Sequence, residues 1–83
     1  MSVNYNHDQI RAALALTDPA ISAYLDLQTG NVVHINETDT SPENEQLRNT
    51  VMESYGERYR YISGGNPSAD AASVTSWMEG EGL

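Results

Sequence analysis

The sequence predicts a small α+β domain in which helices cover one face of a three-stranded antiparallel sheet. Three observations support this class. Apolar residues recur at helical spacing in three segments, they alternate with polar residues in three others, and turn or capping residues separate the segments. The elements follow the order α-β-β-α-β-α, and 83 residues suffice for one core, so we expect a single domain over 1–83.

The first helix is predicted at about 7–17. Asn6 is a suitable N-cap, and Gln9 stands three residues further on, which is a variant of the capping box. Asp18 and Pro19 end the helix, because a proline disfavours helical backbone at the residue before it.

Two alternating segments then flank Thr29-Gly30-Asn31, which predicts a β-hairpin. A three-residue turn over 29–31, with Gly30 or Asn31 at positive φ, gathers the apolar residues on one face of the hairpin. This register pairs Leu27 with Val33, Leu25 with Ile35, and Asp26 with His34.

A second helix is predicted from Pro42 to about Tyr55, with Ser41 as its N-cap and Gly56 at its end. Its apolar stripe has a spacing of four residues and consists of Leu47, Val51 and Tyr55.

The tyrosine-rich segment 58–63 alternates and predicts a third strand, and a last helix over 69–79 begins after Ser68 as N-cap. The second helix can carry the third strand to the free side of the first, which gives the strand order 2-1-3. The expected core consists of Ile10, Leu14, Leu25, Leu27, Val33, Ile35, Leu47, Val51, Val74 and Trp77.

Composition restricts the functions that the chain can have. It has no cysteine, and its 12 acids and 4 bases, all arginine, give a net charge of -8. Disulfides and thiolate zinc sites are therefore excluded, and the charge opposes direct binding of nucleic acid or anionic lipid. No signal peptide or membrane span is recognisable, so we expect a cytoplasmic protein of a bacterium or of a phage-infected cell. The charge favours a basic protein as partner, because opposite charge steers association, although acidity that serves only solubility gives the same composition.

No group of residues predicts catalysis or a cofactor. In the predicted register Asp26 stabilises His34 at the surface, no nucleophile accompanies the pair, and His7 is solvated. Glu37, Asp39 and Glu43 do not have the spacing of a calcium loop, so no metal site is predicted. We therefore expect a protein that is not an enzyme and holds neither cofactor nor metal.

The acidic surface around the second helix is the candidate site. Carboxylates four apart on a helix, or two apart on an extended segment, lie about 6 to 7 Å apart, close to the phosphate spacing of one DNA strand. A row of six is geometrically possible, with apolar contacts beside it, although a merely solvated acidic helix face explains the same pattern. The candidate partner-binding residues are Glu37, Asp39, Glu43, Glu45, Met52, Glu53, Ser54, Tyr55 and Glu57.

Two resemblances bear on this site. The hairpin sequence YLDLQTGNVV, residues 24–33, resembles Uncharacterised Protein Family 0158, with a similar order of elements over about 8–78. That family implies a fold but no catalytic residue. The triplet Glu53-Ser54-Tyr55 is similar in two positions to a glutamate-serine-isoleucine motif of phage inhibitors of uracil-DNA glycosylase, which are acidic DNA mimics. Such inhibitors also receive an apolar side chain of the enzyme, for which a groove lined by Val51, Met52 and Tyr55 is expected.

The leading hypothesis is a non-enzymatic DNA mimic that blocks the DNA-binding cleft of a basic host protein, with uracil-DNA glycosylase as the first target. The alternative is a stand-alone copy of the uncharacterised bacterial domain, which acts as a protein-binding adaptor through its hairpin or its tyrosine-rich strand.

Overall fold

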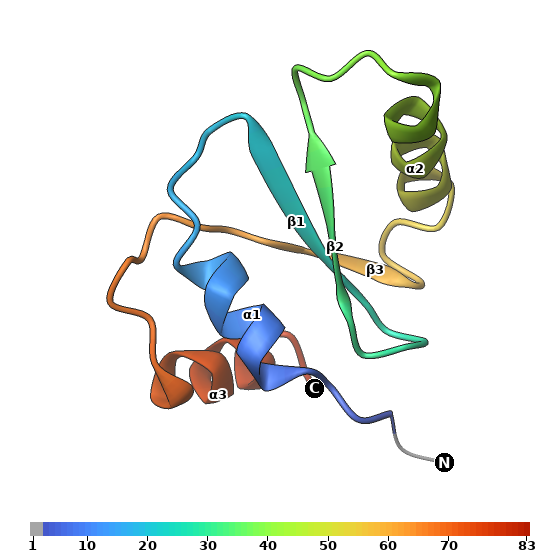
Figure 1. Cartoon of the computed structure of the whole chain (residues 1–83). Coiled ribbons are helices and arrows are strands. Elements are labelled where there is room, and N and C mark those ends of the chain that lie inside the picture. Colours follow the sequence, from blue (N-terminus) through green and yellow to red (C-terminus); the bar gives the residue numbers. More distant parts are fainter. Residues whose placement is uncertain (1–2) are drawn as a thin grey trace.

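The computed structural model describes residues 3–83 and contains the six predicted elements in the predicted order (Figure 1). They are α1 (His7–Leu14), β1 (Ile21–Asp26), β2 (Val32–Asn36), α2 (Pro42–Glu53), β3 (Tyr59–Ile62) and α3 (Ala71–Gly80). The strands form one antiparallel sheet in the order β2-β1-β3, which confirms the predicted class and strand order.

Helices lie on both faces of this sheet. α1 and α3 pack side by side on one face, and α2 lies on the other (Figure 1). Leu25 belongs to the cluster beneath α1 and α3, whereas its neighbour Tyr24 packs with Val51 of α2, because successive strand residues point to opposite faces. The prediction that helices cover one face therefore holds for α1 and α3, while α2 covers part of the second face.

The register of the hairpin differs from the predicted one. The observed partners are Ser22 and Ile35, Ala23 and His34, Tyr24 and Val33, and Leu25 and Val32. The predicted pairs of Leu27 with Val33, Leu25 with Ile35, and Asp26 with His34 are wrong. The Asp26 N–H instead donates to the Asn31 carbonyl at 2.9 Å, which leaves residues 27–30 as the turn.

The second apolar face explains this error. The prediction assumed that one face of the hairpin is polar, but α2 buries Tyr24 and Ile35 on the face opposite α1 and α3. Because both faces of the hairpin bury apolar residues, placing apolar residues on one face and polar residues on the other does not identify the correct register. Gly30 does have positive φ, at 81°, as predicted.

Side-chain and backbone hydrogen bonds join α1 to the hairpin. Asn6 caps the helix by accepting from the Gln9 N–H at 3.0 Å, as predicted, and the Asn6 N–H donates to the Gly30 carbonyl at 2.7 Å. The Gln9 side chain does not complete a capping box, because its Oε1 accepts from the Val32 N–H at 2.8 Å. α1 ends at Leu14, three residues before the predicted end.

The other helix ends are partly as predicted. Ser41 is the N-cap of α2 and Pro42 its first residue. α3 starts later than predicted, because Asp70 rather than Ser68 is its N-cap, in a capping box with Ser73. Tyr55, expected in the buried stripe, lies beyond the end of α2 and is 52% exposed.

The core agrees with the predicted residues in part. Four of these residues, Leu27, Val33, Leu47 and Trp77, are only partly buried against the two clusters. The predicted core residues that are buried are Ile10, Leu14, Leu25, Ile35, Val51 and Val74. Within residues 3–83, no helix combines the length and the apolar character that crossing a bilayer requires.

Candidate functional site

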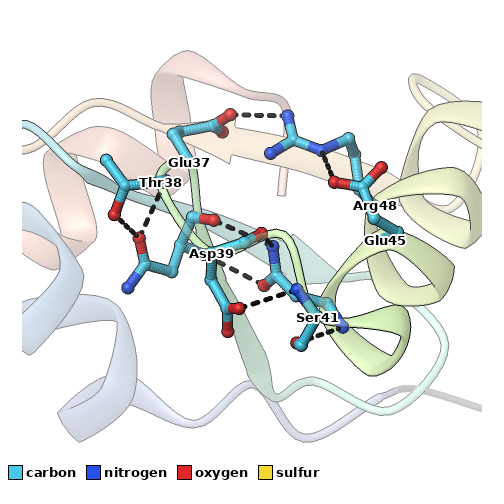
Figure 2. A network of polar contacts seen from close by, with 8 residues as sticks. Glu37, Thr38, Asp39, Ser41, Glu45 and Arg48 are labelled. Atoms are coloured by element: carbon cyan, nitrogen blue, oxygen red, sulfur yellow. Dashed lines mark hydrogen bonds and ion pairs between the residues drawn. The ribbon is translucent and has the colours of Figure 1, made fainter.

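The loop between β2 and α2 is held by a network of polar contacts (Figure 2). The Asn36 Oδ1 accepts from the Thr38 N–H at 2.9 Å, and the Asp39 Oδ1 accepts from the Ser41 N–H at 2.8 Å. Asn44, in the first turn of α2, donates from Nδ2 to the Asn36 carbonyl at 2.8 Å and accepts from the Asn36 N–H at 3.2 Å. The start of α2 is thereby fixed against the end of β2.

Arg48 links this loop to the helix. Its Nη1 contacts the Glu37 Oε2 at 2.5 Å, and its Nε lies 3.9 Å from the Glu45 Oε1 (Figure 2). The hydrogen bond from Arg48 lowers the pKa of Glu37, with a second contribution from Ser22, and the same contact raises the pKa of Arg48. Two candidate carboxylates therefore share one guanidinium, which reduces the charge that they offer to a partner.

The remaining acids of this region are more available. Glu43, Glu53 and Glu57 are exposed, and their carboxylates have no hydrogen bond or ion pair within residues 3–83. Asp39 is also exposed, although its carboxylate holds the loop.

These acids form a broad surface rather than one row. Glu45 and Glu53 are eight residues apart in α2, so their Cα atoms are separated by about 12 Å along the helix axis. Glu43 lies about 160° around the helix from Glu45, so it faces a different direction. The acids of α2 therefore face different directions and alternate with exposed neutral residues such as Gln46, Asn49 and Thr50.

The charge is nevertheless concentrated in this segment. Residues 37–57 carry six acids and one base, Arg48, which gives -5 of the total of -8. The other six acids are distributed over α1, α3, the loop before β1 and the interior, and they are Asp8, Asp18, Asp26, Asp70, Glu79 and Glu81. The α2 side is therefore the strongly charged side of the molecule.

The triplet Glu53-Ser54-Tyr55 lies where α2 ends. Glu53 is the last helical residue, Ser54 is the C-cap, and Tyr55 forms a single bridge with Tyr59 of β3. Met52 and Tyr55 are 48% and 52% exposed, so two large side chains with apolar surface are accessible within two residues of Glu53 in the sequence. The triplet occupies a helix end, which differs from the strand context of the motif that it resembles.

The expected groove beside α2 is absent in its predicted form, because Val51 is 0% exposed and cannot line it. The structure has instead an open cleft of about 290 Å³ between the α1–β1 loop and the end of β3. Asp18, Ser22, Tyr61 and Ser63 are among its lining residues.

Three tyrosines beside α2 form a cluster that the sequence did not suggest. The ring of Tyr24 packs edge-on against Tyr55, with centroids 6.1 Å apart, and tilted against Tyr61 at 5.4 Å. Tyr24 is buried, and burial raises the pKa of its hydroxyl, whereas Tyr55 and Tyr61 are about half exposed. The alternation of Tyr59 and Tyr61 in β3 was visible in the sequence, but only the observed pairing of β1 with β3 places Tyr24 opposite Tyr61.

The buried ion pair of Asp26 was also missed. Arg58, not His34, is its partner, through Nε to Oδ1 at 3.0 Å and Nη2 to Oδ2 at 2.9 Å. His34 and His7 are both exposed. No group of three acidic or histidine side chains suited to a metal ion occurs within the described residues, 3–83.

Comparisons with known proteins give no relative from which a role could be transferred. No family model, curated protein or solved structure matches the chain. The candidate site therefore rests on its own charge, exposure and geometry.

Proposed function

We propose that this protein is a non-enzymatic DNA mimic that blocks the DNA-binding cleft of a basic DNA-processing protein, in the cytoplasm of a bacterium or of a phage-infected cell. The observation that supports this proposal most strongly is the charge of -5 on residues 37–57, next to the exposed side chains of Met52 and Tyr55. A basic cleft that binds phosphates attracts such a surface over long range.

The candidate residues have different roles in this proposal. The unpaired carboxylates of Glu43, Glu53 and Glu57 replace phosphates directly. Glu37 and Glu45 do so after a basic group of the partner displaces or joins Arg48. Asp39 keeps the loop in place through its hydrogen bond with the Ser41 N–H, and the residue is exposed.

The apolar contact lies at the end of α2. Met52 and Tyr55 present apolar surface beside the charged region, and a partner side chain that probes DNA can pack on them. Ser54 caps the helix between them and lies within reach of the same partner. Uracil-DNA glycosylase is the first target to test, because of the resemblance at Glu53-Ser54.

The experiment measures uracil excision from a labelled DNA duplex by uracil-DNA glycosylase as the protein is added, over a series of salt concentrations. The proposal predicts inhibition that competes with DNA and weakens steeply with salt, because the contacts are mostly charged. A pull-down from bacterial lysate at low and high salt extends the search to other targets. If the enzyme is unaffected and no DNA-binding protein is retained at low salt, the proposal is wrong.

A further inference from the structure

The two edges of the sheet differ in how their backbone groups are satisfied. In an antiparallel pair, alternate residues turn their N–H and C=O groups toward the partner strand and away from it. The Leu27 N–H donates to the Arg58 carbonyl at 2.7 Å, so Arg58, Arg60 and Ile62 face β1. The backbone groups of Tyr59 and Tyr61, and the N–H of Ser63 directly after β3, therefore point away from the sheet.

The β2 edge is partly closed by side-chain amides. The outward residues there are Val32, His34 and Asn36. Gln9 accepts from the Val32 N–H at 2.8 Å, and Asn44 bonds to both the N–H and the C=O of Asn36. Among residues 3–83, the Val32 carbonyl and the backbone groups of His34 keep no partner, but the side chains of Gln9 and Asn44 stand on either side of them and hinder a further strand.

The β3 edge is open beyond Tyr59. The chain itself satisfies Tyr59, whose N–H donates to the Ser54 carbonyl at 3.4 Å and whose carbonyl accepts from the Gly56 N–H at 3.0 Å. The N–H and C=O of Tyr61 and the N–H of Ser63, the first residue after β3, have no hydrogen-bond partner among residues 3–83. No proline, lysine or bulge protects this edge, although natural proteins commonly use such devices against strand addition.

The surroundings of this edge favour a basic partner. Tyr61 and Ser63 line the cleft of about 290 Å³, and Asp18 contributes a carboxylate to it. Arg58 and Arg60 do not oppose a cation, because Arg58 is paired with Asp26 and Arg60 lies 3.8 Å from Glu81. A second copy is a poor occupant, since each copy carries a net charge of -8.

We propose that the free edge of β3 at Tyr61 and Ser63 binds an extended, basic segment of a partner protein as a fourth strand of the sheet. The backbone hydrogen bonds supply affinity, and a lysine or arginine side chain of the added strand enters the cleft beside Asp18. This edge does not depend on the acidic surface of α2, so either proposal can fail without the other. It gives the adaptor alternative a defined binding mode through the tyrosine-rich strand.

The test uses a fluorescein-labelled peptide, Lys-Val-Lys-Val-Lys-Val-Lys, and fluorescence anisotropy with the full chain. A second peptide of the same sequence carries N-methyl groups on its three central residues, which removes backbone donors from both of its edges while keeping its charge. The variant Ser63→Pro removes the outward N–H that directly follows β3, and proline is tolerated at such an edge position. Ser63→Ala keeps that N–H and is the matched control.

We expect the unmethylated peptide to bind, and both N-methylation and Ser63→Pro to weaken binding by about tenfold or more, while Ser63→Ala binds like the wild type. Circular dichroism checks that both variants fold. If Ser63→Pro does not fold, the methylated peptide still tests the proposal on the wild-type protein. Equal binding of the two peptides means that charge alone attracts them, which overturns the proposal. A dimer in sedimentation that Ser63→Pro abolishes overturns it too, because a second copy then occupies the edge.

Discussion

The buried carboxylate of Asp26 allows the sharpest prediction about stability. Asp26 is 4% exposed, and besides its two contacts with Arg58 it accepts from the Gln28 N–H at 2.8 Å. The substitution Asp26→Asn keeps an oxygen for Gln28 but replaces the charged acceptor that Arg58 contacts. It therefore removes the ion pair with little change in the volume of the side chain.

The size of the effect follows from these contacts. A hydrogen bond to a charged group contributes about 1.5 to 3 kcal/mol, and Asp26 makes two of them with Arg58. Arg58 is 35% exposed, so water recovers part of the loss. We expect the free energy of unfolding to fall by about 2 to 3 kcal/mol, and Tm by roughly 10 to 20 °C in a chain of this size.

The dependence on pH identifies the cause. The hydrogen bond from Arg58 lowers the pKa of Asp26 below 3.8, and the Gln28 N–H adds to this. A lowered pKa in the folded state means that the stabilisation is present above the ordinary carboxyl pKa and is lost as pH falls through the folded value. Urea unfolding at neutral pH should therefore show the full difference between wild type and Asp26→Asn, and the difference should shrink in strong acid.

Asp8→Asn is the control, because Asp8 is exposed in the first turn of α1. It should change stability much less than Asp26→Asn. If Asp26→Asn is as stable as the wild type at neutral pH, or if its deficit stays constant into acid, the assigned role of the Asp26–Arg58 pair is incorrect.

Two further predictions concern the turns and caps that position α2 and the hairpin. Gly30→Ala should destabilise the protein much more than Gly65→Ala in thermal unfolding: both glycines have positive φ, but a Cβ at Gly30 lies 2.1 Å from the Asn4 carbonyl oxygen and one at Gly65 meets nothing. If the two variants lose equal stability, the positive φ of the glycines accounts for the loss and the close approach of Asn4 does not. Ser41→Ala should lower the unfolding free energy by about 1 kcal/mol, measured with urea, because the Asn44 N–H loses its cap, and Ser41→Asn should restore most of it.

Local signals in the sequence were sufficient for some of this structure. Asn6 and Ser41 cap their helices as predicted, because an N-cap depends on residues three positions away. Gly30 takes positive φ for a similarly local reason. The element order and the strand order followed from these boundaries and from the alternation of apolar residues.

Contacts between distant segments were not predictable in the same way. The hairpin register depends on α2, which covers the second face and makes Tyr24 and Ile35 core residues. The partner of Asp26 is Arg58, which is 32 residues away and reaches it only in the pairing of β1 with β3. Without the register, neither the tyrosine cluster nor the free edge of β3 could be placed.

The candidate site was likewise predictable in its local features but not in its contacts between distant residues. Its charge was evident from composition, but Arg48 lies between Glu37 and Glu45 only because the loop folds back over α2. Tyr55 was expected inside and is exposed, which adds apolar surface to the site instead of to the core.

The most direct test of the DNA-mimic proposal compares charge reversal on the two sides of the molecule. Glu53→Lys and Asp8→Lys each change the net charge equally, and both residues are exposed on helices, but only Glu53 belongs to the proposed surface. We predict that Glu53→Lys weakens inhibition of uracil-DNA glycosylase, or binding to the DNA-binding protein retained at low salt, by about tenfold or more, and Asp8→Lys by much less. Equal effects of the two reversals would contradict a defined mimic surface and leave only the overall charge.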